Sequence, residues 1–198
     1  MEQGGNMSNL TLPSAWPGLW RGGVRKSIAI DLDTVLNNLN DVWLERYNAD
    51  YKDNVTNADL KTWDIASFVK CGANIYDYLK EPGFFRNLKP QPYAIEATKW
   101  MAEHFDLCIA TAYVPQACLD KAEWVDEYFP HIGSNNIIFC NDKGKILTDY
   151  LIDDGGHNIE AFKGRGIVYD QPYNEYLIGY PRVSNWLEIQ THFMEVAR

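Results

Sequence analysis

The segment SIAIDLDTVL, residues 27–36, decides the fold class that this sequence predicts. Residues 27–33 form a short β-branched and apolar run, which predicts a buried strand because strands of parallel sheets are nearly continuous apolar runs. The run ends in two carboxylates, Asp31 and Asp33. If the strand continues to its end, both side chains project to one side, because side chains alternate along a strand. The chain therefore opens its regular part with a buried strand that carries paired carboxylates.

The rest of the chain alternates between strand-like and helix-like patterns. Strands are predicted at 105–111, 136–140, 150–153 and 166–170, and helices at 37–48, 92–104, 115–129, 157–164 and 184–197. This alternation predicts an α/β fold, an open three-layer Rossmann-like parallel sheet.

Two stretches of the chain differ in character from this regular part. Residues 46–88 are polar, aromatic and broken by turns, with short helical pieces at about 57–70 and 73–80, so we expect a small helical cap inserted after the first strand. Residues 1–24 read as a loose leader, and the α/β core is expected at 25–45 and 89–198.

Composition excludes several classes of protein. The chain has 198 residues with 18 Lys and Arg against 27 Asp and Glu, a net charge of −9, which leaves no basic footprint for a nucleic-acid polymer or an anionic membrane. We find no apolar run long enough to span a membrane and no signal-peptide pattern. Four cysteines without a C-x-x-C pair are typical of free thiols in a reducing compartment, and we expect a cytoplasmic protein.

Polar residues follow the predicted strands, where ligands bind in open parallel sheets. These residues are Asp31 and Asp33 after the first strand, Thr111 after the second, Lys143 after the third, and Asp153 with Asp154 after the fourth. Clustered carboxylates need a cation, and their hard oxygen ligands suit Mg²⁺. Such a site can bind a phosphate: one Asp attacks phosphorus and the second moves the proton.

The motifs now resemble those of a known family. DLDTVL, CIATA, Lys143 and LIDD match, in order, the four motifs of the haloacid dehalogenase superfamily of phosphohydrolases. The stretches EPGFFRNLKP, NDKGKILTDYLIDD, YDQPYN and RVSNWLEI resemble the 5'(3')-deoxyribonucleotidases and their bacterial and phage relatives, over about residues 26–190. The resemblance implies a Mg²⁺-dependent enzyme that hydrolyses a small phosphomonoester, a (deoxy)nucleoside monophosphate, through an aspartyl-phosphate.

The same resemblance implies roles for individual residues. Asp31 aligns with the nucleophile, and Asp33 with the general acid and base. Thr111 aligns with the hydroxyl that binds the transferring phosphoryl group, and Lys143 with the lysine that holds the phosphoryl oxygens and the nucleophile.

For the metal, the resemblance implies three ligands: Asp31, the backbone carbonyl of Asp33, and Asp154. Asp153 aligns with an acid that supports the metal ligands without binding the metal. Asn174, in the YDQPYN stretch, lies in another loop at a strand end, with no role assigned.

Two residues of the expected phosphate pocket depart from the family pattern. Thr34 stands where most relatives have glycine; its amide can still donate to phosphate, but its β-branched side chain stiffens and narrows the loop. Ala112 replaces a small hydroxyl residue, which removes one phosphate hydrogen bond. Asn37 and Asn38 stand where the family often has an acid.

Several alternatives stay open at this level. Lys145 is a rival to Lys143, although the spacing to Asp153 favours Lys143. The substrate is a nucleoside monophosphate or another phosphomonoester such as a sugar phosphate, and a catalytically weak binding module with the same fold is a third reading. The sequence leaves open whether the chain forms a homodimer. Six aromatic residues of the insertion either stack on a nucleobase or form the core of the cap: Trp63, Phe68, Tyr76, Tyr78, Phe84 and Phe85.

Overall fold

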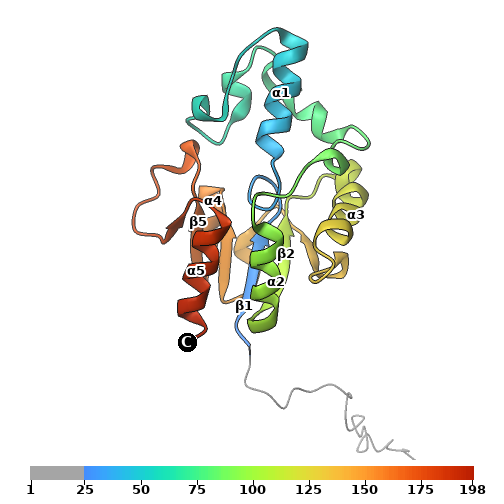
Figure 1. Ribbon diagram of the computed structural model, residues 1–198. Helices are drawn as coiled ribbons and strands as arrows, with labels where there is room; N and C mark the ends of the chain where they lie inside the picture. Colours follow the sequence, from blue (N-terminus) through green and yellow to red (C-terminus); the bar gives the residue numbers. More distant parts are fainter. Residues whose placement is uncertain (1–24) are drawn as a thin grey trace, which may run out of the picture.

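The structure is a computed structural model that describes residues 25–198, so the predicted leader at 1–24 lies outside the described residues. A six-stranded sheet with the order β3-β2-β1-β4-β5-β6 runs through its centre, and every neighbouring pair is parallel (Figure 1). The strands are β1 Ser27–Asp31, β2 Asp106–Thr111, β3 Ile137–Phe139, β4 Tyr150–Asp153, β5 Arg165–Tyr169 and β6 Arg182–Val183. β1 therefore lies inside the sheet, between β2 and β4.

Helices cover both faces of this sheet. They are α2 Ala94–His104, α3 Cys118–Tyr128, α4 Gly156–Ala161 and α5 Trp186–Val196, whereas α1 Leu39–Tyr51 lies above the sheet (Figure 1). Ile28 and Ile30 of β1 face a core that includes α2, α3 and α5, whereas Ala29, one residue away, faces the core that includes Ile159 of α4. Figure 1 shows α2 and α5 side by side on one face. The continuous apolar run of β1 is thus explained by burial on both faces.

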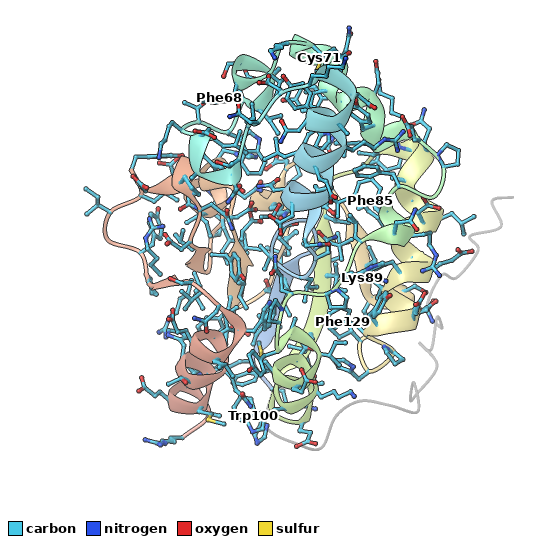
Figure 2. All side chains as sticks on the ribbon, turned by 45° about the horizontal axis from the view of Figure 1, so that its top comes forward. Phe68, Cys71, Phe85, Lys89, Trp100 and Phe129 are labelled. Atoms are coloured by element: carbon cyan, nitrogen blue, oxygen red, sulfur yellow. The ribbon has the colours of Figure 1, made fainter. Side chains whose placement is uncertain are left out.

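The chain between α1 and α2 folds into four short 3-10 helices above the sheet. They are η1 Asn57–Asp59, η2 Ile65–Phe68, η3 Gly72–Lys80 and η4 Phe85–Asn87. Their apolar side chains share a second buried cluster with Trp43 and Tyr47 of α1. Phe68 and Cys71 belong to this upper part, and Trp100 and Phe129 lie around the sheet (Figure 2).

Four more 3-10 helices lie in the loops of the sheet. They are η5 Pro115–Ala117, η6 Ser134–Asn136, η7 Lys143–Lys145 and η8 Pro172–Asn174. Two of them, η7 and η8, follow β3 and β5 at the carboxyl edge of the sheet. They carry side chains of the candidate site described below.

The predicted fold class is confirmed: the sheet is open, parallel and covered by helices on both faces. Two local predictions differ from the structure. β1 ends at Asp31, so Asp33 lies in the turn after the strand and does not share a strand face with Asp31. The edge strand β6 was not predicted, because two residues are too short to show a period. Within residues 25–198, no helix has the length and apolar character needed to cross a membrane.

Candidate active site

The carboxyl ends of β1, β2 and β4 bring the predicted polar residues together. Asp31 ends β1, Thr111 ends β2 and Asp153 ends β4, with Asp154 next along the chain. All four side chains are buried. They converge because parallel strands present their carboxyl ends at one edge of the sheet.

Lys143 lies in η7 and joins two of these carboxylates. Its Nζ is 2.6 Å from Asp31 Oδ1 and 2.6 Å from Asp153 Oδ2. Burial disfavours the charged ammonium, but Asp153 and Asp31 outweigh burial and raise the pKa of Lys143 above its usual value. Lys145, the rival lysine, is exposed and pairs with Asp142 at 3.2 Å. The structure therefore places Lys143 in the site as a fixed positive charge and Lys145 on the surface.

The two neighbouring acids after β4 have different partners. Asp153 Oδ2 accepts from Lys143, and Asp153 Oδ1 accepts from the amide of Gly155 at 2.7 Å and from Asn158 Nδ2 at 3.0 Å. Asp154 Oδ2 accepts from the hydroxyl of Tyr173, but Asp154 Oδ1 is buried without a hydrogen-bond partner. A buried polar atom of this kind calls for an explanation, and an absent ion is one. Asp153 is satisfied by the protein, and Asp154 has an oxygen free for a ligand.

Asp31, Asp153 and Asp154 form a cluster that fits a metal ion. One oxygen from each lies within 4.8 Å of the others. Burial raises the pKa of Asp31 to about 7. The positive charge of Lys143 opposes this shift, and the negative charges of Asp153 and Asp33 add to it. Burial and the charge of Asp31 likewise raise the pKa of Asp154 well above its ordinary value. Three buried carboxylates carry more negative charge than one lysine can neutralise. Hard oxygen donors of this kind suit Mg²⁺, which would supply the missing positive charge.

Asp33 points to a separate set of donors. Its Oδ2 accepts from Lys121 Nζ at 2.6 Å and from the Thr111 hydroxyl at 3.3 Å, and its Oδ1 accepts from Asn37 Nδ2 at 3.2 Å. Lys121 Nζ also donates to Thr111 Oγ1 at 2.8 Å. The Thr111 hydroxyl is thus shared between Lys121 and Asp33, and its predicted contact with a phosphoryl group stays a prediction.

Lys121 was not found by sequence reasoning. It lies in α3 with a side chain that is 1% exposed, and its Nζ is 4.6 Å from the ring centroid of Phe85. Most lysines are surface charges, so the residue type alone does not indicate a buried position. A signal was present, because Lys121 stands three and four residues before the buried Trp124 and Val125, inside the apolar stripe of its helix. A lysine on a buried helix face requires an acidic partner, which here is Asp33.

Thr34 holds the turn between the two aspartates in a rare conformation. Its φ is +70°, in the left-handed region that favours glycine and is a genuine outlier for a β-branched residue. The Thr34 amide donates to Asn37 Oδ1 at 3.1 Å, and Asn37 Oδ1 also accepts from the Leu39 amide at 3.0 Å. The departure from glycine therefore carries backbone strain, which the buried Asn37 side chain stabilises.

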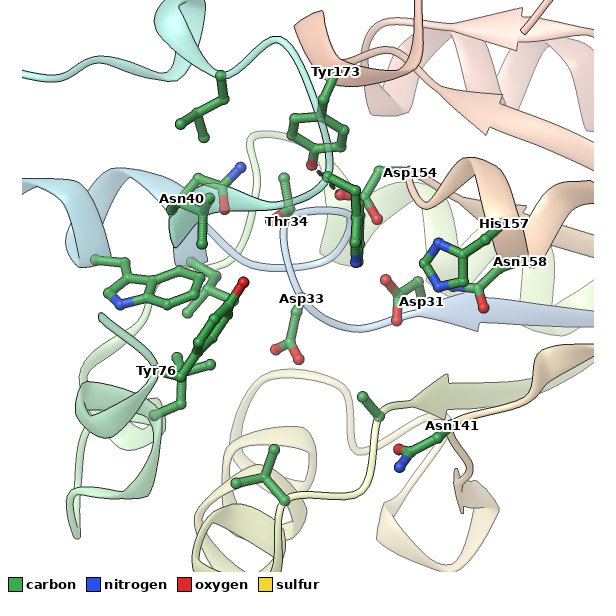
Figure 3. A pocket seen from close by; sticks show the side chains of 18 of the residues that line it. Asp31, Asp33, Thr34, Asn40, Tyr76, Asn141, Asp154, His157, Asn158 and Tyr173 are labelled. Carbon is green, nitrogen blue, oxygen red and sulfur yellow. Dashed lines mark hydrogen bonds between the residues drawn. The ribbon is translucent and has the colours of Figure 1, made fainter. Parts of the chain in front are cut away.

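A cavity of about 300 Å³ opens above these residues (Figure 3). The residues that line it include Asp31, Asp33, Lys143 and Asp154, together with Thr34, Ala112, Asn141, His157 and Asn158. Aromatic and apolar residues line the rest: Trp43, Trp63, Tyr76, Phe85 and Tyr173 among them. The other aromatics predicted for the insertion, Phe68, Tyr78 and Phe84, pack in the upper hydrophobic cluster. The volume is typical of small-molecule sites, which combine an apolar wall with a few convergent polar groups.

The sequence of this chain is similar to those of known nucleotidases. The sequence model of the family described as 5' nucleotidase, deoxy (pyrimidine), cytosolic type C protein matches residues 25–198. A 5'(3')-deoxyribonucleotidase of Clostridium acetobutylicum is 45% identical over 166 residues, which cover 83% of this chain and 92% of that protein. A 5'(3')-deoxyribonucleotidase of Bacillus subtilis is 34% identical over 169 residues, which cover 84% of this chain and 98% of that protein.

Solved structures support the fold. A haloacid dehalogenase-like hydrolase of Streptococcus pneumoniae superposes with a TM-score of 0.59 at 12% identity, covering 85% of this chain and 98% of that one. A haloacid dehalogenase (HAD) family hydrolase of Deinococcus radiodurans superposes with a TM-score of 0.59 at 13% identity, covering 86% of this chain and 96% of that one. The resemblance drawn from the motifs is thereby confirmed. The chain belongs to the family of 5' nucleotidase, deoxy (pyrimidine), cytosolic type C proteins, and it is a hydrolase with the haloacid dehalogenase fold.

Proposed function

We propose that this protein is a Mg²⁺-dependent 5'(3')-deoxyribonucleotidase that removes phosphate from (deoxy)nucleoside monophosphates through an aspartyl-phosphate. One observation carries the proposal: Asp31 stands at the end of a central strand, 2.6 Å from Lys143, and lines a cavity that also has aromatic walls. The carboxylates and Lys143 suit the phosphate, and the aromatic wall suits a planar base. The names of the relatives from Clostridium acetobutylicum and Bacillus subtilis support the same substrate class.

In the first step, an oxygen of the Asp31 carboxylate attacks phosphorus, and the bond from phosphorus to the ester oxygen breaks. Asp33, in its acid form, donates a proton to the leaving 5' or 3' oxygen, and the nucleoside departs. Lys143 holds Asp31 in place and offers positive charge to the phosphoryl oxygens. The products of this step are a neutral nucleoside and a phosphoryl group bound to Asp31.

In the second step, water attacks the phosphorus of the aspartyl-phosphate. Asp33, now a carboxylate, accepts the proton of that water, and the bond from phosphorus to Asp31 breaks. Inorganic phosphate leaves, and Asp31 and Asp33 return to their starting states. Lys121 and Asn37 keep Asp33 near the reaction through direct hydrogen bonds in both steps.

A magnesium ion fits the donor set of this site. Asp31, Asp154 through its unpartnered Oδ1, and the backbone carbonyl of Asp33 would hold it. When bound, the ion supplies positive charge that neutralises the carboxylates and the phosphoryl oxygens.

We further propose that residues 46–88 act as a cap over a core formed by 25–45 and 89–198. The separate hydrophobic cluster of the upper part supports this division, as does the position of the cavity, which has walls from both parts. Helix α1 crosses the proposed boundary without a break and joins the cap to β1. A cap over a cavity of about 300 Å³ admits a nucleoside monophosphate and excludes a nucleic-acid polymer.

The test is phosphate release from a panel of deoxynucleoside, ribonucleoside and sugar monophosphates, with Mg²⁺ and with chelator. We expect release from deoxynucleoside monophosphates that stops when chelator is added. The Asp31→Asn variant should lose at least about 1,000-fold in kcat, because a carboxamide is not a nucleophile. Asp106→Asn is the matched control: it makes the same change at the first residue of β2, at the edge of the sheet opposite to the site, and should keep wild-type kcat.

Borohydride reduction of acid-quenched enzyme, followed by mass spectrometry, should locate the acyl phosphate at Asp31. Hydrolysis of sugar phosphates alone would overturn the substrate class. An Asp31→Asn variant with wild-type turnover would overturn the covalent mechanism.

A further inference from the structure

Tyr173 lies in η8, in the loop after β5, and its hydroxyl contacts the proposed metal site. The side chain is buried, and the hydroxyl donates a hydrogen bond to Asp154 Oδ2 (Figure 3). The other oxygen of the same carboxylate, Asp154 Oδ1, has no hydrogen-bond partner, and Asp154 belongs to the carboxylate cluster with Asp31 and Asp153. The hydrogen bond from Tyr173 thus satisfies Oδ2 of Asp154 and leaves Oδ1 available to the ion.

This division of the two oxygens has a physical consequence. A carboxylate can rotate about its terminal torsion, which is broad, so an unsupported Asp154 would sample orientations that do not face Asp31. The hydrogen bond from Tyr173 selects one orientation. Partners of this kind, which touch a metal ligand and not the metal, typically change metal affinity by about 10–100-fold when they are removed.

Tyr173 is itself held from two sides. On the core side, Asn174 Nδ2 donates to the backbone oxygens of Asp154 and Tyr169, each at 2.8 Å, which ties η8 to the ends of β4 and β5. On the other side, the ring of Trp63 meets the Tyr173 ring edge-on, with centroids 5.5 Å apart. Trp63 belongs to the segment that we propose as the cap.

The same loop has a second direct link to the upper part of the molecule. Asn57 Nδ2 donates to Gln171 Oε1 at 2.7 Å, and Asn57 Oδ1 accepts from Asn40 Nδ2 at 3.0 Å. On the core side, Arg182 of β6 donates to Asn174 Oδ1 at 2.7 Å. The loop therefore connects the proposed cap to the residue that orients Asp154.

We propose that Tyr173 is the positioning residue that orients Asp154 for the metal ion, and that Trp63 couples the cap to the metal site through the Tyr173 ring. This inference rests on the proposed function, because it assumes that Asp154 binds Mg²⁺. The coupling is reciprocal: a cap that packs on Tyr173 tightens metal binding, and a bound metal favours the packed cap by the same factor.

The test measures Mg²⁺ binding to the full chain by isothermal titration calorimetry without substrate, so that no turnover is involved. Tyr173→Phe keeps the ring and removes the hydroxyl, and we expect its Kd for Mg²⁺ to rise about tenfold. Tyr78→Phe is the matched control, because the Tyr78 hydroxyl also donates to an aspartate, Asp50 at 2.6 Å, but outside the site. We expect Tyr78→Phe to bind Mg²⁺ with wild-type affinity.

A second variant tests the link to the cap. Trp63→Leu removes the aromatic contact while Tyr173 stays intact, and we expect a rise of about fivefold in the Kd for Mg²⁺. Thermal unfolding of each variant, followed with excess chelator, separates a change in metal affinity from a loss of folded protein. Wild-type affinity in Trp63→Leu overturns the coupling to the cap.

The outcomes distinguish this inference from the proposed function. Wild-type protein that binds Mg²⁺, together with Tyr173→Phe that binds it equally tightly, overturns the role of Tyr173 and leaves the proposed metal site standing. Wild-type protein that binds no Mg²⁺ overturns the proposed metal site itself.

Discussion

Replacing Asp154 by asparagine should stabilise the metal-free protein and remove its stabilisation by Mg²⁺. Asp154 is buried with Asp31 and Asp153, and one oxygen from each lies within 4.8 Å of the others. Lys143 is the ammonium that directly pairs with this cluster, through Asp31 and Asp153. Asp154→Asn keeps an oxygen that can accept from the Tyr173 hydroxyl, so the main change is the loss of one negative charge.

The magnitude follows from the distances. Two unit charges 4.8 Å apart repel by about 3.5 kcal/mol at an effective dielectric constant of about 20. At a pH high enough to ionise all three carboxylates, Asp154 meets two such repulsions and one attraction from Lys143, which leaves roughly one repulsion, about 3 kcal/mol. At about 2–4 °C per kcal/mol for a chain of this size, Tm should rise by about 6–12 °C. Saturating Mg²⁺, at about 100 times its Kd, should stabilise the wild-type protein by about 2.7 kcal/mol and the variant hardly at all.

The assay is urea unfolding of both proteins at pH 5 and pH 8, with chelator and with Mg²⁺. The pKa of Asp31 is raised to about 7, so its contribution to stability is present at low pH and lost as the pH rises through about 7. The wild-type metal-free protein should therefore be less stable at pH 8 than at pH 5, and the advantage of the variant should be largest at pH 8. A variant that is no more stable than wild type at pH 8 in chelator would refute the reasoning.

Three further predictions concern residues around the site and the sheet. Lys121→Met should lower the free energy of unfolding by about 2–3 kcal/mol, because it leaves the Asp33 carboxylate without its buried cation. Asp33→Asn should recover part of this loss in the double variant. Additive effects in a double-mutant cycle measured by urea unfolding would contradict the pairing. Thr34→Gly should raise Tm by about 2–4 °C, because the backbone strain relieved at φ +70°, about 1–2 kcal/mol, exceeds the entropy cost of glycine. A lower Tm in thermal unfolding would show that the turn is not strained. Gly164→Ala should destabilise the protein by about 1–3 kcal/mol, because a Cβ there would lie 2.7 Å from two backbone carbonyl oxygens. An unchanged midpoint of urea unfolding would show that the backbone moves to accommodate the methyl group at no cost in stability.

Much of the fold could be predicted from local pattern. The apolar run that ends at Asp31 and the later alternation of strands and helices predicted an open parallel sheet, and the structure has it. The exceptions are short or irregular. β6 has two residues and no period, and the short helical pieces predicted for the upper part are 3-10 helices that pack against α1.

The candidate site could be predicted where a residue follows a strand directly. Asp31, Thr111, Asp153 and Asp154 belong to this class, because parallel strands place their carboxyl ends together whatever the loops do. Lys121 and Tyr173 belong to another class. Each reaches the site from a helix or a loop that packs against the sheet, and the distance along the chain from Lys121 to Asp33 is 88 residues.

The sequence by itself determined which chemical groups are present at the carboxyl edge of the sheet and in what order. The tertiary structure decided how they are paired: Lys143 with Asp31 and Asp153, Lys121 with Asp33, and Tyr173 with Asp154. The physical reason is that the positions of the strands along the chain follow from local apolar periodicity. The partner of a buried charge, in contrast, depends on side-chain directions and desolvation that arise only when separate segments pack together.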